Sequence, residues 1–508
     1  MVDTLKDKRK AEFGDFQTPQ DLAEQACLLL RDLSIEAASI VEPNCGEGNF
    51  LSVAVKSFPS VKEVIGADIN PGYIDLSRQK VSRAKLRCED FFKTDWHKLF
   101  SKLPEPILLV GNPPWVTNAD LGLMASANLP IKQNFQNRTG LDAVTGKSNF
   151  DISEWMLIHE LKWLQGKKAT LAMLCKTAVA RKVLHHAWQH SFSITDASIY
   201  RIDAFKHFDA AVDACFFICT IGEQQSFDCK VFDSFDATEP INIFGYQDGQ
   251  LVANVEAYER SKHLQGTERY KWRSGIKHDC SPVMELKRVG DQYANGLGAL
   301  VSLEPDCLYP MLKSSNVARG DTGMTDRFML VPQMTTGEET ESIAERLPLT
   351  WSYLQQHGEL LDLRGSSIYK KRPRFSIFGV GPYSFLPWKV AISGFYKSVA
   401  FRKVGPTEGK PTVFDDTVNF ISCTTEEEAD LLATILNSSV TAELLSAFIF
   451  WDAKRPLTIE LLRKIDVLRI AEVLRLDADV EKYLAPVAEE KQKEITLQTP
   501  FVFEATSA

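Results

Sequence analysis

Short apolar runs alternate with amphipathic stretches through about the first 220 residues of the chain. Apolar runs over residues 39–43, 63–68 and 108–111 end at acids, Asn or Pro, which predicts buried strands of a parallel sheet. Residues 51–58 and 71–81, between these runs, carry apolar side chains at helical spacing. This alternation predicts an α/β domain.

The pattern continues on both sides of these five segments. A turn-rich lead ending in Thr18 and Pro19 precedes a helical stretch, and it suits a Thr N-cap with Pro in the first helical position. The last two strands are expected to form a hairpin, which gives a mainly parallel sheet with an antiparallel edge. The further predicted elements are helices over 20–33, 151–164 and 177–190 and strands over 85–88, 168–175, 193–201 and 214–221.

The strand over 108–111 runs directly into Asn112-Pro113-Pro114-Trp115. Proline cannot donate to a ladder, so the strand stops there and delivers Asn112 to the sheet edge where α/β proteins bind ligands. An aromatic NH2 group is a poor nucleophile because its lone pair is delocalised. Hydrogen bonds from that group to the Asn112 side-chain oxygen and the Pro113 carbonyl would favour a tetrahedral nitrogen. Trp115 would stack on the planar substrate. The alternative is that the same four residues form only a Pro-rich turn after a core strand.

Polar residues also follow the other predicted strands. Glu42 leads into a Gly-containing turn that lacks the spacing of a pyrophosphate-binding loop, so a compact ligand with a cationic group is expected there. Asp68 ends the next strand and suits ribose hydroxyls, and Asp90 follows the third. Each acid alone could be a helix cap or a loop residue. The ordered series with Asn112 instead predicts one site along one sheet edge.

Composition sets the class and the compartment. A chain of 508 residues with 44% hydrophobic and 25% charged residues is typical of a globular protein with two or three domains. No signal peptide or membrane span is expected, because the N-terminus is charged and no later segment gives about 18 uninterrupted apolar residues. No metal site is expected, because the ten cysteines and His278 form no paired framework. The predicted location is cytoplasmic, with reduced thiols.

The net charge of -9 means that local basic clusters must carry any contact with nucleic acid. Such clusters are usually only solvated faces. The candidate DNA-binding residues are Lys370, Lys371, Arg372 and Arg374.

Two stretches lack a regular pattern. Residues 118–149 are polar and long, and a lid over the site is the hypothesis for them. Residues 222–250 are expected to be a polar transition between domains.

The ordered motifs resemble the Class I (Rossmann-like) S-adenosylmethionine-dependent methyltransferases, and more narrowly the DNA adenine-N6 methyltransferases of bacterial restriction-modification systems, in the TaqI-methyltransferase-like subgroup. The motifs are Phe16-Gln17-Thr18-Pro19, Glu42 to Gly48, Asp68, Asp90-Phe91 and Asn112 to Trp115. The resemblance implies a catalytic group of Asn112, Pro113, Pro114, Trp115 and Phe208, the last packing on the other face of a flipped adenine. The S-adenosyl-L-methionine site that it implies is Thr18, Glu42, Asn44, Cys45, Gly46, Asp68, Ile69, Asp90, Phe91 and Asn112.

The second half is more loosely similar to a TaqI-type specificity domain, through residues 308–313, 383–404, 436–438 and 454–457. We therefore expect a methyltransferase domain over 1–250 and a mixed α+β domain over 251–508 that recognises double-stranded DNA. The alternatives are a Class I methyltransferase acting on RNA or on a protein glutamine, a cytosine-N4 DNA methyltransferase and a binding-only module. No convincing nuclease motif is present, so any cognate restriction endonuclease is expected to be a separate protein.

Overall fold

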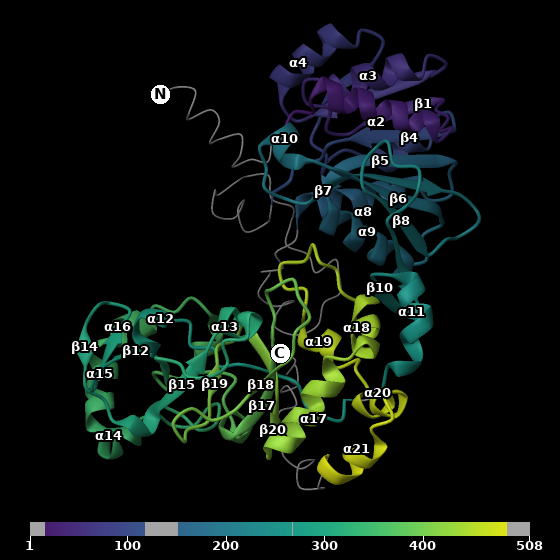
Figure 1. Ribbon diagram of the computed structural model, residues 1–508. Coiled ribbons are helices and arrows are strands. Elements are labelled where there is room, and N and C mark those ends of the chain that lie inside the picture. The colour runs from purple at the N-terminus through teal and green to yellow at the C-terminus, as the bar shows by residue number, and fades with distance from the viewer. Residues whose placement is uncertain (1–15, 117–150, 267, 485–508) are drawn as a thin grey trace, which may run out of the picture. The chain divides into compact units, whose positions relative to one another are not determined.

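The computed structural model describes residues 16–116, 151–266 and 268–484, and the chain folds into two compact units, residues 1–256 and 257–508 (Figure 1). The division falls six residues after the boundary expected at 250. The predicted lid segment, residues 118–149, lies outside the described residues.

The first unit is built on a ten-stranded sheet with strand order β10-β9-β8-β6-β7-β5-β4-β1-β2-β3. The strands β3, β2, β1, β4 and β5 are parallel neighbours, and β7 runs antiparallel between β5 and β6. The sheet strands are β1 (Ser39–Glu42), β2 (Glu63–Asp68), β3 (Lys85–Cys88), β4 (Ile107–Gly111), β5 (Ala169–Lys176), β6 (Ile194–Ile202), β7 (Ala214–Ile221), β8 (Asp228–Phe232), β9 (Asn242–Gln247) and β10 (Gln250–Val252).

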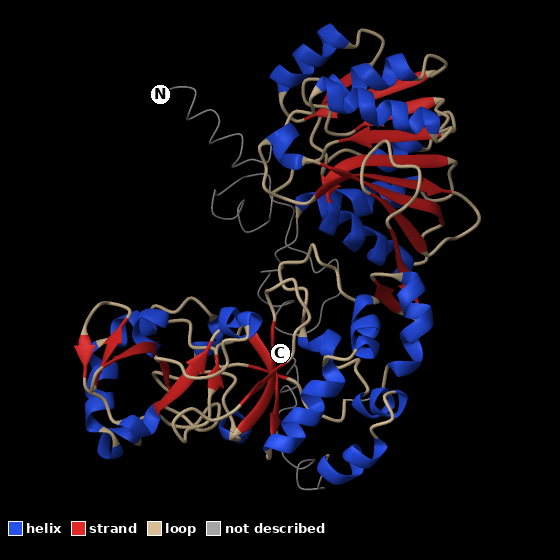
Figure 2. Cartoon of the chain, viewed as in Figure 1, coloured by secondary structure: helices blue, strands red, loops and turns tan. Residues whose placement is uncertain are grey.

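Helices lie on both faces of this sheet (Figure 2). Alternate residues of the central strands, such as Leu108 and Val110 of β4, join the apolar core that contains the buried faces of α2 and α3. The helices are α2 (Gln20–Asp32), α3 (Asn49–Ser57), α4 (Pro71–Lys80), α5 (Trp96–Phe100), α8 (Ile152–Leu164), α9 (Thr177–Gln189), α10 (Ala204–Phe208) and, at the end of the unit, α11 (Val255–Ser261). The predicted Class I α/β architecture is confirmed.

Three sequence-based expectations were wrong here. Residues 222–250 are no polar transition, because they contribute β8 and β9, and β10 follows at once; β6 and β7 are therefore interior strands and form no edge. The missed signal is Asp248-Gly249, whose φ values of 48° and 78° make the tight turn between β9 and β10. Thr18 does not cap α2, since Pro19 occupies the N-cap position and no side-chain bond caps the helix.

The second unit contains two smaller sheets, with strand orders β11-β20-β17-β18 and β14-β13-β12-β16-β15-β19. Their strands are β11 (Arg273–Ser274), β12 (Glu285–Val289), β13 (Gln292–Asn295), β14 (Leu300–Val301), β15 (Leu308–Leu312), β16 (Arg327–Leu330), β17 (Trp388–Ser393), β18 (Arg402–Val404), β19 (Val413–Phe414) and β20 (Val418–Cys423). The six-stranded sheet lies on a core that includes Met311, Met329 and Phe375, and a second core around Phe414 and Phe420 lies next to the four-stranded sheet.

Helices surround both sheets in a mixed α+β arrangement. They are η1 (Lys262–Leu264), α12 (Ser281–Met284), η2 (Pro305–Cys307), α13 (Ser314–Arg319), α14 (Ile343–Arg346), α15 (Pro348–Gln356), α16 (Gly358–Asp362), η3 (Ser367–Tyr369), η4 (Pro382–Phe385), α17 (Glu426–Leu436), α18 (Ser439–Ser446), α19 (Ile459–Leu462), α20 (Val467–Val473) and α21 (Asp477–Tyr483).

Candidate active site

A cavity of about 250 Å³ opens where β1, β2 and β4 end, as the ordered strand-end residues predict. Its lining contains every predicted cofactor residue that follows β1 and β2, together with Asn112. The lining residues are Phe16, Gln17, Thr18, Glu42, Asn44, Cys45, Gly46, Asn49, Phe50, Asp68, Ile69, Asn70, Tyr73, Asn112 and Pro114.

The turn after β1 is held open by Gly46 and by Asp68. Gly46 has φ of +49°, and a Cβ there would collide with the side chain of Gln17. Its N–H donates to Asp68 Oδ2 at 2.9 Å, while Asp68 Oδ1 accepts from Asn70 N at 2.8 Å. Each carboxylate oxygen can accept further bonds, so Asp68 shapes the turn and still offers acceptors to a ligand.

Glu42 ends β1, and the residue is only 2% exposed. Burial raises its pKa well above the ordinary value, and the nearby Asp68 raises it further against the effect of one backbone hydrogen bond. Within the described residues no donor reaches its Oε2 atom. A buried carboxyl with an unused oxygen on the cavity wall suits a cationic group of a ligand, which would both satisfy and ionise it.

Asn112, just after β4, is half-satisfied in the same way. Its Nδ2 donates to the Phe16 carbonyl at 2.8 Å, and its buried Oδ1 has no donor among the described residues. The reverse amide orientation would set two oxygen acceptors against each other, so the bond to Phe16 fixes Oδ1 as the free acceptor. The sequence argument assigned this acceptor role to the same atom.

Three aromatic rings cluster beside Asn112. The ring centroids of Trp115 and Phe208 are 5.0 Å apart, and Phe16 lies 5.7 Å and 5.8 Å from them. Trp115 is 5% exposed and Phe208 8%. A planar base between two rings needs a separation of roughly 7 Å, or two van der Waals contacts, so these rings are in direct contact and leave no slot between them.

A lysine fastens the turn that carries Trp115. Lys176, the last residue of β5, donates through Nζ to the Trp115 carbonyl at 3.1 Å and to Asp151 Oδ2 at 2.6 Å. Asp151 is the N-cap of α8 and accepts from Ser153 N. Ile152 N also donates to the Val116 carbonyl at 3.0 Å. The turn after β4 and the start of α8 are therefore joined, and sequence spacing gave no signal of this bridge.

Asp90 and Phe91 do not line the cavity. Asp90 Oδ1 accepts from Phe92 N at 2.9 Å and its other oxygen pairs with Lys93 at 3.0 Å, so the carboxylate closes its own turn. Phe91 is buried against the aromatic rings of Trp96 and Trp163. Their predicted place in the cofactor pocket therefore has no support in the cavity lining.

The predicted basic cluster lies in the second unit, after η3. All four side chains are exposed. Arg374 is already paired, because its guanidinium meets both oxygens of Asp362 at 2.8 Å and 3.2 Å. No ion pair involves Lys370, Lys371 or Arg372 within the described residues. Arg374 is thus the one member of the cluster with an ion-pair partner among the described residues, and its contact with DNA stays a prediction.

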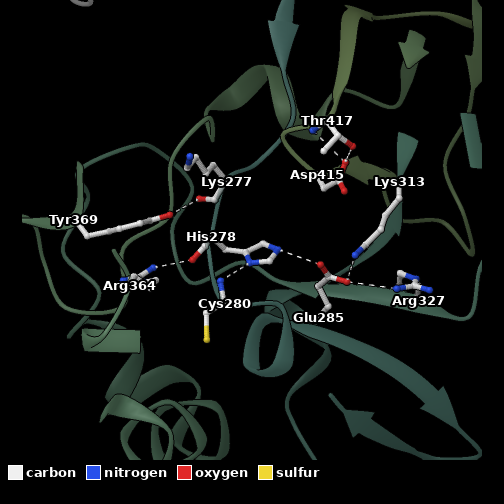
Figure 3. Close-up of polar contacts among 10 residues, drawn as sticks. All are labelled: Lys277, His278, Cys280, Glu285, Lys313, Arg327, Arg364, Tyr369, Asp415 and Thr417. Atoms are coloured by element: carbon white, nitrogen blue, oxygen red, sulfur yellow. Dashed lines mark hydrogen bonds and ion pairs between the residues drawn. The ribbon is translucent and has the colours of Figure 1, made fainter. Parts of the chain in front are cut away.

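The second unit also contains a partly buried ionic network around Glu285 (Figure 3). Glu285 is paired with Lys313 Nζ at 2.6 Å, Arg327 at 3.4 Å and His278 Nε2 at 3.5 Å, and Cys280 N donates to His278 Nδ1. Burial would raise the pKa of Glu285, but the bonds from His278 and Lys313 outweigh it and lower the pKa to about 2. Each residue shown in Figure 3 bonds to another residue of the protein, which is typical of a network with a structural role.

Metal ligation and membrane insertion find no support in the described residues. No group of three or more His, Cys, Asp or Glu side chains that could hold a metal occurs in that part of the chain. Across residues 16–116, 151–266 and 268–484, no helix is both long and apolar enough to cross a membrane.

Comparison with known proteins identifies the family. The chain is 45% identical over 475 residues to the type II methyltransferase M.NspV of Nostoc sp., covering 92% of this chain and 99% of that protein. This chain belongs to the type II methyltransferases of restriction-modification systems. It is thus an S-adenosylmethionine-dependent DNA methyltransferase, as the sequence motifs predicted.

Two further comparisons cover part of the chain and its fold. The type II methyltransferase M.CvrRI of Paramecium bursaria Chlorella virus XZ-6E is 32% identical over 113 residues, which cover 22% of this chain and 27% of that protein. The solved type IIL restriction-modification enzyme MmeI, in complex with DNA, superposes with a TM-score of 0.50 at 12% identity, over 87% of this chain and 64% of that chain, and supports the fold. No family model matches the sequence.

Proposed function

We propose that this methyltransferase transfers a methyl group to N6 of an adenine flipped out of double-stranded DNA. The observation that carries the proposal is the buried Oδ1 of Asn112, an acceptor without a donor among the described residues at the end of β4. An exocyclic NH2 group supplies the missing donor, and a second bond to the Pro113 carbonyl would hold its nitrogen pyramidal. The nitrogen lone pair would then point at an electrophile and not into the ring.

The cavity residues fit the cofactor that supplies this electrophile. Bound S-adenosylmethionine presents a methyl group activated by a sulfonium. Glu42 would accept from its ammonium group and Asp68 from its ribose hydroxyls. Thr18, Asn44, Cys45, Gly46 and Ile69 also line the cavity. Asp90 and Phe91 stay candidates for its outer side.

The transfer needs little acid-base chemistry from the chain. The bond from N6 to the methyl carbon forms as the carbon–sulfur bond breaks, and the electron pair of that bond stays on sulfur in S-adenosylhomocysteine. The surplus proton on N6 leaves to solvent, because the methylated aminium nitrogen is a strong acid. Asn112, Pro113 and Pro114 thus act by alignment, which is worth several orders of magnitude in rate.

Base capture would involve Trp115 and Phe208. Because their rings touch, an entering adenine must part them or displace Phe16, which contacts both. Extruding the base costs a few kcal/mol, and stacking on these rings offsets part of that cost.

The second unit would recognise the duplex sequence, with Lys370, Lys371 and Arg372 on phosphates. This division of labour suits a modification enzyme whose cognate restriction endonuclease is a separate protein.

The decisive experiment identifies the methylated nucleoside. Duplex DNA is incubated with the protein and isotopically labelled S-adenosylmethionine, digested to nucleosides and analysed by mass spectrometry. We expect labelled N6-methyl-2′-deoxyadenosine. Labelled N4-methylcytosine would transfer the Asn112 argument to the exocyclic amine of cytosine, and a duplex that carries no label would refute the proposal.

A further inference from the structure

Three loops of the second unit are linked in series by contacts through residues 276–277 and 415–416. They are residues 369–374, which start at the last residue of η3, residues 394–401 between β17 and β18, and residues 447–458 between α18 and α19. We infer that this three-loop surface is where the unit contacts double-stranded DNA, with Tyr396 and Trp451 as its apolar contact points. The inference rests on the proposed function and extends it to residues that the basic cluster does not contain.

Contacts link the three loops in series. The Tyr369 hydroxyl donates to the Lys277 carbonyl at 3.4 Å, as Figure 3 shows, and the residue before Lys277 forms a bridge with Asp415. The next residue, Asp416, pairs with Arg455 at 4.0 Å. The Arg455 guanidinium in turn lies 4.6 Å from the ring centre of Phe395.

Side-chain bonds hold the 394–401 loop at both ends. Ser393 Oγ accepts from Phe395 N at 3.3 Å and from Tyr396 N at 3.2 Å. At the other end Asn437 bonds both the N–H and the carbonyl of Phe401, at 2.9 Å and 2.8 Å. A loop fixed in this way presents its tip with little ordering entropy left to lose on binding.

The other two loops are fixed as well. Asn419 donates to the Leu457 carbonyl at 3.0 Å, which holds the end of the 447–458 loop on β20. The Arg364 guanidinium lies 3.7 Å from the Tyr369 ring centre. Lys371 has a left-handed φ of 64°, a conformation that costs free energy and that is often found at binding sites.

The chemistry of the loop tips fits a nucleic acid. Tyr396 and Trp451 are 43% and 39% exposed, although large aromatic side chains usually avoid water. Lys397 and Lys454 are exposed within three residues of these rings, and neither forms an ion pair within the described part of the chain. Rings beside free cations suit sugars and base edges flanked by phosphates. This concentration of positive charge stands out in a chain of net charge -9.

The first test removes charge. Lys397→Gln and Lys454→Gln together should lower the slope of log affinity against log salt by about 1.8, because each phosphate contact contributes about 0.9. The control variant is Lys287→Gln, an exposed lysine on β12 paired with Asp326, which should leave the slope unchanged. Equal slopes for the double variant and the wild type would overturn the inference.

The second test removes the rings. Tyr396→Ala and Trp451→Ala should each weaken binding to a duplex about tenfold while S-adenosylmethionine affinity, measured by calorimetry, stays the same. Val473→Ala, an exposed apolar residue on α20, is the control and should bind normally. Trp451→Phe, which keeps an aromatic ring, should recover most of the affinity and separates ring loss from misfolding.

The outcomes distinguish this inference from the proposed function. If the wild-type protein methylates adenine and the variants bind DNA normally, the inference of a three-loop surface is overturned and the catalytic proposal stays intact. A wild-type protein that methylates no DNA refutes the catalytic proposal first. Competition by duplex RNA as strong as that by duplex DNA would overturn the assignment of DNA as the partner.

Discussion

Glu42 ends β1 in the first unit and Glu285 begins β12 in the second, and both carboxyls are largely buried. Burial raises the pKa of Glu42, whereas bonds from His278 and Lys313 overcome burial and lower the pKa of Glu285. The difference lies in the partners: Glu42 Oε2 has no donor among the described residues, and Glu285 meets three cationic or imidazole groups.

The comparison separates two uses of a buried polar group. A fully paired carboxylate is stable as it stands and holds loops together. A half-satisfied group costs free energy until a ligand supplies the missing bond. Glu42 and Asn112 are both half-satisfied and both line the same cavity, which points to two ligand groups, one cationic and one with an NH2 donor.

The largest effect is expected for Asn112→Ala. Loss of the preorganised acceptor should lower single-turnover methylation by two or more orders of magnitude, roughly 3 kcal/mol, with cofactor affinity little changed. Asn242→Ala is a matched control, because Asn242 also donates through Nδ2 to a backbone carbonyl and leaves Oδ1 without a partner among the described residues, outside the cavity lining. Equal rates for the two variants would remove Asn112 from the mechanism.

Glu285→Gln tests the other side of the comparison. Leaving Lys313 and Arg327 without their anion should destabilise the second unit by roughly 2–3 kcal/mol at pH 7, less than for a fully buried pair because both cations are partly exposed. A carboxyl whose pKa is lowered by folding contributes its full stability at pH values above its pKa in the unfolded chain. The difference between wild type and variant should therefore shrink as pH falls from 4.5 towards about 2.

Urea denaturation at pH 7 and pH 3 measures this difference. Glu408→Gln is the control, since Glu408 forms an exposed pair with Arg288 and its loss should hardly move the midpoint. A pH-independent difference between wild type and Glu285→Gln would contradict the ionic account.

Glu42→Gln should weaken S-adenosylmethionine binding by roughly 1.5–2 kcal/mol, the worth of a charge-assisted hydrogen bond. The raised pKa means that the empty site favours the neutral acid, whereas the bound ammonium favours the carboxylate. Wild-type affinity should therefore rise with pH through that raised pKa, with release of a proton on binding. Calorimetry in two buffers of different ionisation enthalpy detects the proton, and its persistence in Glu42→Gln would assign it to another group.

Lys176→Met should have a smaller effect. Losing the bridge between the Trp115 carbonyl and Asp151 should lower kcat about fivefold without changing cofactor affinity, because the catalytic turn is less firmly held. Lys176→Arg should restore most of the rate. Lys182→Met, which breaks the neighbouring pair with Glu154, is the control. Loss of cofactor binding in Lys176→Met would indicate general misfolding.

The same comparison shows what sequence alone could predict. Local signals sufficed for β1 to β5 and for the series Glu42, Asp68 and Asn112, because parallel strands bring their carboxyl ends to one edge. Asp90 follows that rule along the chain, yet its carboxylate closes its own turn. The Lys176 bridge joins residues 25 and 61 positions apart, and no periodicity encodes such a contact.

The smallest effects are expected for the basic cluster of the second unit, where four cations that look alike in the sequence differ in their ion pairs. Arg374 meets both oxygens of Asp362, an arrangement that uses the fork of the guanidinium and neutralises its charge. Lys370, Lys371 and Arg372 lack such a partner within the described residues.

If these three residues lie on DNA phosphates, each change to Gln should lower the salt slope of binding by about 0.9, and Arg374→Gln should leave the slope unchanged. Since exposed pairs contribute little, Arg374→Gln should also alter stability by less than about 1 kcal/mol. A salt titration of the four variants on one methylatable duplex decides the matter: four equal slope changes would return Arg374 to the DNA contact surface, and four unchanged slopes would remove the whole cluster from it.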